Sequence, residues 1–235
     1  MSAPQNHLIE TLPPADRDRL LALCKPVQLL FGDVLCQPGD TLRHVHFPVD
    51  GFISLLANTD DHPGLEVGMV GREGMLGVHM ALGVARAPLH ALVQGEGMAW
   101  RASASVFREA LAHSAPLRRL VGRYTYVMML QQSASAGCLR YHLIAPRLAR
   151  WLLMTQDRAH TERFRVTQDF MAYMLGVRRV GVTAAARMLQ DGGLIRYARG
   201  DLTVLDRSGL EAAACSCYAT DAASYARQLR DAAAG

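Results

Sequence analysis

Two different hydrophobic periods divide this chain. From residue 27 to about residue 101, short alternating runs of apolar and polar residues are separated by glycines at 32, 39, 51, 64, 71, 74, 95 and 97. Alternation places one face of each strand in a core, and glycine supports tight turns, so these runs predict a small β domain. From about residue 104 the apolar positions recur every three to four residues, which predicts helices.

The helical half divides into separate segments. We expect helices over 104–112, 115 to about 137 and 139–156, with Pro146 marking a first turn or a kink in the last of them. A short helix over 16–23 follows Pro13-Pro14, and an alanine-rich helical tail begins at residue 208. The fold class predicted is α+β.

The predicted helix over 115–137 carries one apolar stripe. Two interpretations are open: the stripe packs on the core of the same chain, or it forms a dimer interface. We favour the dimer, because the stripe is longer than a small β domain could cover. The stripe consists of Leu117, Leu120, Val121, Tyr124, Val127, Met128 and Gln131.

A helix-turn-helix is predicted after residue 166. Thr167 is suited to cap a helix that ends at Gly176, where glycine adopts the left-handed conformation, and a second helix begins at about Arg178. Residues 195–205 then predict a hairpin with an Arg199-Gly200-Asp201 turn, which would act as a wing. The positions facing inward are all apolar: Met171, Ala172, Leu175, Val177, Val182, Ala185 and Leu189.

The outward face of the second helix carries the chemistry. Arg179, Thr183 and Arg187 are spaced i, i+4 and i+8, so they follow one side, and an arginine there can read guanine in a DNA major groove. The alternative is an ordinary solvated helix. Gly181 costs about 1 kcal/mol of helix propensity, so its presence needs a reason. We expect that it allows the backbone to approach DNA closely. The predicted DNA contacts are Thr167, Gln168, Arg178, Arg179, Thr183, Arg187, Arg196 and Arg199.

Charge supports double-stranded DNA as the partner. Residues 140–235 hold 14 arginines and 9 acidic residues, whereas residues 1–139 hold 11 basic and 12 acidic residues. The excess positive charge therefore lies on the half that contains the predicted helix-turn-helix. Lys25 is the sole lysine; this use of arginine suits phosphate and guanine, or reflects a GC-rich genome.

The order of a β domain, a long helix and the stretch TQDFMAYMLGVRRVGVTAAARMLQDGGLIRYARGDLTVLD resembles the Crp/Fnr family of bacterial transcription regulators over nearly the whole chain. The resemblance implies a cyclic-nucleotide-binding-like β-roll (jelly roll) sensor over 1–114, a dimerisation helix over 115–138 and a winged helix-turn-helix over 139–235. It also implies a homodimer that reads a palindromic site, an unidentified small-molecule effector, and RNA polymerase as a partner of an activator.

Single positions refine what the resemblance implies. Arg179 falls where the family has its guanine-reading arginine, and Thr167 where a threonine contacts phosphate. Val180 replaces a base-contacting glutamate and Ala184 replaces a further arginine. We therefore expect a DNA sequence different from that of the cyclic-AMP receptor.

The sensor half departs from the cyclic-nucleotide pattern. In EGMLGVHMALGVARAP, Arg86 lies near the phosphate position, but Met75 stands where the ribose-binding glutamate belongs. Loss of that charge-assisted hydrogen bond costs roughly 1.5–3 kcal/mol, so cyclic nucleotide is disfavoured. Arg86 and Met75 remain the candidate effector residues, and Arg86 is otherwise a surface or pairing residue.

No cofactor or metal is expected. An iron–sulfur centre needs more N-terminal cysteines than Cys24 and Cys36, and His79 is only loosely placed as a haem ligand. His44 and His46 lack a third ligand. Cys215 and Cys217 fit a redox or metal pair, but two thiols without function is the interpretation we favour.

The remaining patterns concern location and activity. Five cysteines without a CxxC favour a reducing compartment, and neither a signal sequence nor a long apolar run is present, so we expect a cytoplasmic protein with no membrane partner. The chain lacks a nucleophile elbow, an HExxH and a phosphate loop, so we do not expect an enzyme. The alternative to a DNA-binding regulator is a ligand-binding sensor module without sequence-specific DNA binding.

Overall fold

Two short helices precede the β domain. In the computed structural model, which describes residues 6–59 and 62–233, they are α1 (His7–Glu10) and α2 (Pro14–Ala22). The buried Asn6 caps α1, and its side-chain amide donates to the carbonyl oxygens of Pro48 and Gly74, each at 2.8 Å. These bonds fix the start of the described chain onto the β domain.

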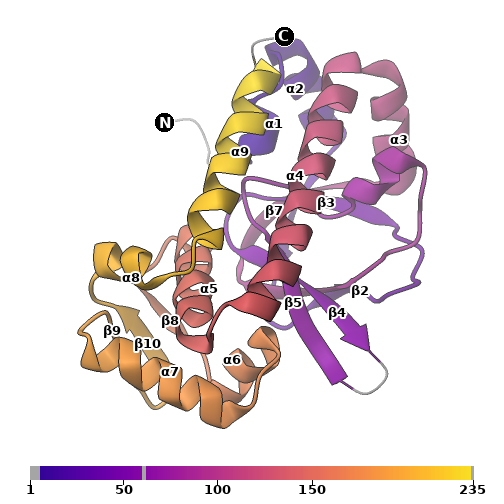
Figure 1. Cartoon of the computed structure of the whole chain (residues 1–235). Helices are drawn as coiled ribbons and strands as arrows, with labels where there is room; N and C mark the ends of the chain where they lie inside the picture. The colour runs from indigo at the N-terminus through magenta and orange to yellow at the C-terminus, as the bar shows by residue number, and fades with distance from the viewer. Residues whose placement is uncertain (1–5, 60–61, 234–235) are drawn as a thin grey trace.

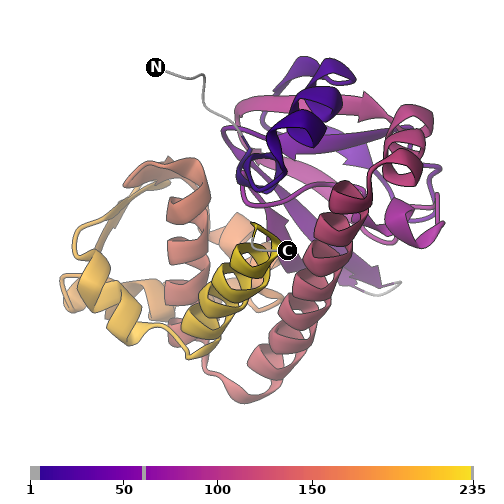
Figure 2. The same cartoon turned by 90° about the horizontal axis from the view of Figure 1, so that it is seen from above.

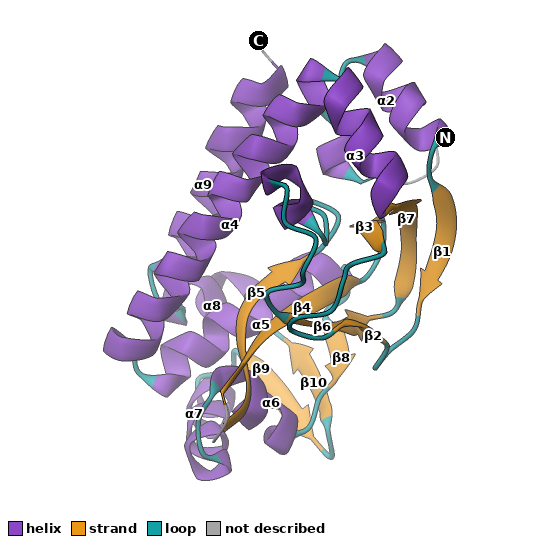
Figure 3. Ribbon diagram, turned by 90° about the vertical axis from the view of Figure 1, so that its right-hand side faces the viewer, coloured by secondary structure: helices purple, strands orange, loops and turns teal. Residues whose placement is uncertain are grey.

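Two antiparallel sheets form the predicted β-roll (Figure 3). One has the strand order β1-β7-β3 and the other β2-β6-β4-β5, so strands distant in sequence are neighbours. A single-turn 3-10 segment, η1 (Val78–Leu82), lies between β5 and β6. The strands are β1 (Lys25–Leu29), β2 (Val34–Cys36), β3 (His44–Pro48), β4 (Phe52–Thr59), β5 (His62–Val70), β6 (His90–Gly95) and β7 (Gly97–Ser103).

A long helix connects the roll to the second half of the chain (Figure 1). After α3 (Ala104–His113), the helix α4 runs over Ala115–Tyr141, past the expected end near residue 137. The Ser114 hydroxyl accepts the Leu117 N–H at 3.1 Å and caps α4. The next helix, α5 (Ile144–Ala159), begins after only two residues, and Pro146 lies in its first turn.

The apolar stripe of α4 is buried by the chain itself. The C-terminal helix α9 (Cys217–Ala233) lies beside α4 in Figures 1 and 2. The ring of Tyr225 packs against Tyr124, with 6.4 Å between centroids, and its hydroxyl lies 3.9 Å from the sulfur of Met128. All seven stripe residues are buried against α9 and the roll. The argument that a second copy must cover this stripe was therefore wrong, because the tail covers it.

A second core holds the C-terminal half together. It joins α5, the two short helices α6 and α7, and a three-stranded sheet of order β8-β10-β9. Phe52, Leu56 and Met69 of the roll belong to this same core, so the two halves pack on each other. The bounds are α6 (Gln168–Leu175), α7 (Arg179–Asp191), β8 (Arg163–Arg165), β9 (Ile195–Ala198), β10 (Asp201–Val204) and α8 (Arg207–Ala213).

Strand β8 and the C-terminal tail differ from the sequence prediction. Strand β8 was not predicted, because an alternation of only three residues is too short to indicate a strand. The tail is two helices, α8 and α9, separated by residues 214–216.

Among the helices described, none combines the length and the hydropathy required to cross a membrane.

Candidate nucleic-acid interface

The helix-turn-helix begins as the sequence predicts. The Thr167 hydroxyl accepts the N–H of Phe170 at 3.1 Å and caps α6. Gly176 ends α6 with φ of +61°, a conformation that glycine adopts without strain. Helix α7 follows after Val177 and Arg178, with Arg178 at its N-cap.

The inner face of the helix pair is closed. Val182 and Met171 are completely buried, and Ala172 lies where the helices meet. Of the seven inward positions predicted, Val177 alone is half-buried, and the other six are buried. Met174 and Ala186 are also buried and were missed, because the predicted stripe was drawn too narrow.

The predicted DNA-contacting residues lie on the surface. Gln168 is half-buried, and the other seven, Thr167, Arg178, Arg179, Thr183, Arg187, Arg196 and Arg199, are exposed. Two apolar side chains share the outer surface of α7: Val180 is 72% exposed and Met188 is 66% exposed. Apolar side chains exposed singly are common on protein surfaces, so the arginines and not these two side chains distinguish this face.

Hydrogen bonds hold this surface in one arrangement. The Thr183 hydroxyl donates to Gln168 Oε1 at 2.7 Å, which ties α7 to the start of α6. Arg179 forms an ion pair with Asp169, with 3.3 Å between nitrogen and oxygen. Because both side chains are more than 60% exposed, water screens this pair and leaves the guanidinium free to exchange partners.

A hydrogen bond connects the β9–β10 hairpin to α7. The N–H of Tyr197 in β9 donates to Gln190 Oε1 near the end of α7, at 2.8 Å. Burial raises the pKa of the Tyr197 phenol, which donates to the Val166 carbonyl at 3.1 Å. Figure 1 shows α7 and the β9–β10 hairpin side by side, at the end of the molecule opposite α2 and α3.

The turn of the wing is one residue shorter than expected. Ala198 pairs with Asp201, so the loop contains only Arg199 and Gly200, and Asp201 belongs to the strand. Both loop residues have positive φ, +53° and +86°, as two-residue hairpins of type I′ require. Arg199 is held at the tip in a conformation unfavourable for a side chain with a Cβ.

Gly181 has a packing role that the sequence prediction missed. A Cβ added there would lie 2.6 Å from Ile144 Cδ1, at the start of α5. Gly181 therefore faces α5, and the glycine leaves room for Ile144 between the two helices. Packing against Ile144 accounts for this glycine, and the expected close approach to DNA stays untested.

The two candidate effector residues lie in different surroundings. Met75 is buried and lines a cavity of about 160 Å³ between the roll and α4, together with His79 and Met128. Arg86 does not line it; its guanidinium donates to the Gly39 carbonyl at 2.9 Å. The cavity is mostly apolar, and burial lowers the pKa of His79, so the lining presents little positive charge to a phosphate.

Comparison with known proteins identifies the architecture. Residues 146–213 match the family model for the Crp-like helix-turn-helix domain. The chain thus carries a Crp-like helix-turn-helix domain. A search of curated protein sequences finds no match.

Solved structures extend the likeness to more than four fifths of the chain. A putative Crp/Fnr-family transcriptional regulator from Eubacterium rectale is 17% identical, with a TM-score of 0.68 over 88% of this chain and 96% of that one. The c-di-GMP responsive global regulator CLP of Xanthomonas campestris is 18% identical, with a TM-score of 0.67 over 83% and 100%. A Crp/Fnr-family regulator from Thermus thermophilus is 20% identical, with a TM-score of 0.67 over 81% and 98%. The resemblance to Crp/Fnr regulators is confirmed, as is the α+β fold of roll, long helix and winged helix-turn-helix.

Proposed function

We propose that this chain is a homodimeric transcription regulator that reads a palindromic DNA site through the helix at about 178–190. The observation that carries the proposal is the exposed row of Arg179, Thr183 and Arg187 on α7, beside a wing that bears Arg196 and Arg199. Thr167, Gln168 and Arg178 complete the proposed contact set. The guanidinium of Arg179 is placed for guanine, and the remaining groups for phosphates or nearby base edges.

The dimer is supported by an exposed stripe on α4. Five residues of α4 form what we call the outer stripe, and the spacing between them alternates between four and three residues. They are Gly122, Tyr126, Met129, Ser133 and Ala136. Met129 is 60% exposed and Tyr126 48% exposed, although both are large and apolar. A 3.5-residue repeat, here with small residues on either side of two large ones, is the spacing by which two helices pack closely. The occupant we propose is α4 of a second copy.

Each of the three segments of the chain has its own proposed role. We propose a sensor over 1–114, a dimerisation segment over 115–138 and a DNA-binding domain over 139–235. In this arrangement the long helix would set the distance between two recognition helices at about one turn of DNA, roughly 34 Å. A ligand that changed this distance would change DNA affinity.

The effector that we propose binds in the cavity beside Met75. At about 160 Å³ the cavity is smaller than the roughly 300 Å³ at which ligand pockets usually begin, and its lining is largely apolar. Because Arg86 is engaged with Gly39, a cyclic nucleotide would find no arginine or lysine for its phosphate in the lining. We therefore propose a small, weakly polar effector instead of a nucleotide.

The test is DNA binding by the full chain. Genome-wide footprinting should give a palindromic motif, and gel shifts on that motif should weaken steeply with salt. Arg179→Ala should weaken specific binding by about 1–3 kcal/mol, whereas Arg108→Ala, an exposed arginine on α3, should leave it unchanged. Binding without sequence preference would overturn the proposal in favour of a sensor module that does not read DNA.

A further inference from the structure

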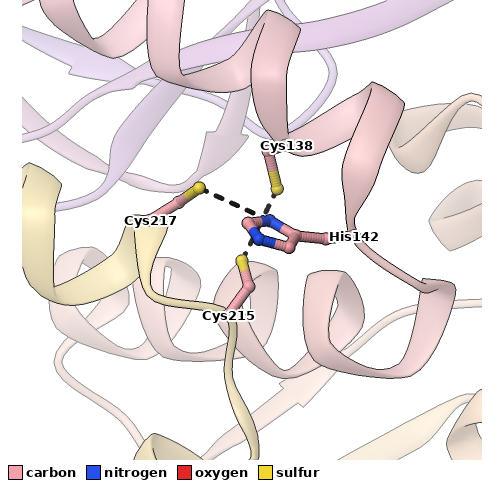
Figure 4. A group of neighbouring side chains, drawn as sticks. All are labelled: Cys138, His142, Cys215 and Cys217. Carbon is pink, nitrogen blue, oxygen red and sulfur yellow. Dashed lines mark hydrogen bonds between the residues drawn. The ribbon is translucent and has the colours of Figure 1, made fainter.

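Four side chains with metal-binding donors meet at the end of α4. Cys138 lies in the last turn of α4 and His142 directly follows it, while Cys215 and Cys217 flank the start of α9 (Figure 4). Their donor atoms, three sulfurs and one ring nitrogen, all lie within 4.8 Å of one another. Residues 77 positions apart in the sequence thus meet at one point, which sequence reasoning could not foresee.

Two of the six distances between donor atoms are close to the edges of a zinc tetrahedron. The Sγ atoms of Cys138 and Cys215 are 3.5 Å apart, and Cys217 Sγ is 3.6 Å from His142 Nδ1. With Zn–S of about 2.3 Å and Zn–N of about 2.0–2.1 Å, tetrahedral edges are about 3.8 Å between sulfurs and about 3.6 Å between sulfur and nitrogen. The donors therefore need only small rotations to close on one ion.

The backbone holds the donors in place. The N–H of His142 donates to the Cys138 carbonyl at 3.1 Å, which sets these side chains one turn apart on the same side. The N–H of Cys215 donates to the Pro146 carbonyl at 3.3 Å, and the N–H of Tyr218 donates to the Cys215 carbonyl at 3.0 Å. These bonds fix the two cysteines of the tail against the start of α5, so the ligand set is ordered before a metal arrives.

The surrounding charge suits a site of three thiolates. Zinc with three thiolates and a neutral histidine carries a net charge of −1. Two arginines of α5, the buried Arg147 and the half-buried Arg150, act electrostatically on Cys138 and Cys215. Both of these cysteines are buried, while His142 and Cys217 are half-buried, which leaves a route for the ion to enter.

We propose that Cys138, His142, Cys215 and Cys217 form a structural zinc site. Four protein ligands fill a tetrahedral ion completely and leave no position for substrate, so the site is structural and not catalytic. On binding, the three thiols release their protons to solvent and the imidazole binds as the neutral base. No oxidant or reductant is required.

The site would control the joint between the two halves of the chain. Only residues 142 and 143 separate α4 from α5, and His142 is one of the proposed ligands. Zinc would tie this joint to the start of α9, which packs along α4. The metal would thereby fix the angle between the long helix and the helix-turn-helix domain. An effect on DNA affinity rests on the proposed function, whereas the metal site does not.

Metal content is the direct test. We expect the full chain, purified under reducing conditions without a metal-binding tag, to hold about one zinc ion per chain by elemental analysis. Replacing zinc by Co²⁺ should give the intense visible bands of tetrahedral thiolate coordination. Cys217→Ser should weaken zinc binding by more than the roughly 10- to 100-fold that loss of an outer-shell partner costs. The matched control Cys24→Ser, a half-buried cysteine of the roll, should keep the wild-type zinc content.

Other results would overturn the proposal. A chain that takes up neither zinc nor cobalt when reduced has no such site, and zinc content unchanged in both Cys217→Ser and His142→Ala places the ion elsewhere. Iron with inorganic sulfide would assign these residues to a cluster instead. A Cys138–Cys215 disulfide that persists in reducing cytosol extracts would assign them to a redox pair. Circular dichroism of each variant separates loss of metal from loss of fold, and none of these measurements involves DNA.

Discussion

Glu66 of β5 lies where the roll meets the DNA-binding half. It accepts hydrogen bonds from the Ser54 hydroxyl at 2.5 Å and from the Trp151 indole N–H of α5 at 3.1 Å. Burial raises the pKa of its carboxyl to about 7, although these two hydrogen bonds and the charges of Arg158 and Arg150 oppose that shift. The folded chain therefore holds a proton here that the unfolded chain releases at lower pH.

The free energy of unfolding should consequently fall as pH rises from about 4.5 to about 7. The full effect of this group is at most about 3 kcal/mol. Glu66→Gln keeps an acceptor for Trp151 and a polar partner for Ser54 but cannot ionise, so it should be more stable than wild type at pH 8 and flatten the profile. Urea denaturation at several pH values measures this. Glu96→Gln, at an exposed site, should retain the wild-type slope.

Gly181 shows how the packing role of one missing side chain can be missed from sequence alone. Its cost in helix propensity is real, but the space that it leaves is occupied by Ile144 of α5. The atom in the way is the end of a flexible side chain, so the obstacle is small.

Within the helix pair, Gly181→Ala should leave DNA affinity unchanged, because the new methyl faces α5. The free energy of unfolding should change little, since a gain of about 1 kcal/mol in propensity is offset by displacing Ile144. In the Ile144→Val background Cδ1 is absent, so the same substitution should show nearly the full gain. Thermal denaturation of the four proteins measures this, and an altered gel shift would restore the DNA role for Gly181.

At the scale of elements, α4 has two working faces. One face is covered by the roll and by α9, whereas the outer stripe stays exposed. A helix of 27 residues that is buried on one side only needs a reason for its other side.

Met129→Glu should convert the dimer to a monomer, because two carboxylates would meet where the outer stripes pack. Light scattering during size-exclusion chromatography measures the mass directly. The matched control is Ala112→Glu, an exposed site on α3, which should remain dimeric. A wild-type chain that is monomeric at micromolar concentration would contradict the dimer, and the gel shift on the palindrome should weaken with the Met129 variant.

At the scale of the whole molecule, several contacts couple the roll to the DNA-binding half. Any side chain at Gly64 of β5 would overlap Tyr173 of α6, so this part of β5 lies directly against the helix-turn-helix. Arg158 of α5 forms an ion pair with Glu73 of the roll, at 2.7 Å. These contacts join the roll directly to the half of the chain that carries the helix-turn-helix.

Glu73→Ala should lower the free energy of unfolding by about 3 kcal/mol, since it leaves the Arg158 charge buried without its partner. The Arg158 side chain is only 8% exposed, so its unpaired charge would cost more free energy than that of a residue in a surface ion pair. The control is Asp191→Ala, whose pair with Arg187 is 82% and 70% exposed and should contribute less than about 1 kcal/mol. If denaturant titrations gave equal losses of unfolding free energy for Glu73→Ala and Asp191→Ala, the ion pair at Glu73 would contribute no more than a surface pair and would not couple the halves.

The sequence determined what depends on neighbouring residues. Glycine-punctuated alternation predicted the roll, and Thr167 with Gly176 predicted the helix-turn-helix, because capping and left-handed turns are set by local chemistry. The exposed arginines of α7 and the wing follow from helical and hairpin spacing alone. Local sequence was therefore sufficient for the order of most elements and for the proposed DNA-contacting surface, although it missed β8 and the break between α8 and α9.

Only the tertiary structure decided which distant segments cover one another. The stripe of α4 appeared to need a second copy, but α9 from the same chain buries it, and Gly181 accommodates a side chain of α5. Cys138 and Cys215 are far apart in sequence, and no spacing rule joins them. Such contacts depend on how complete helices pack against each other, a long-range property that local periodicity does not encode.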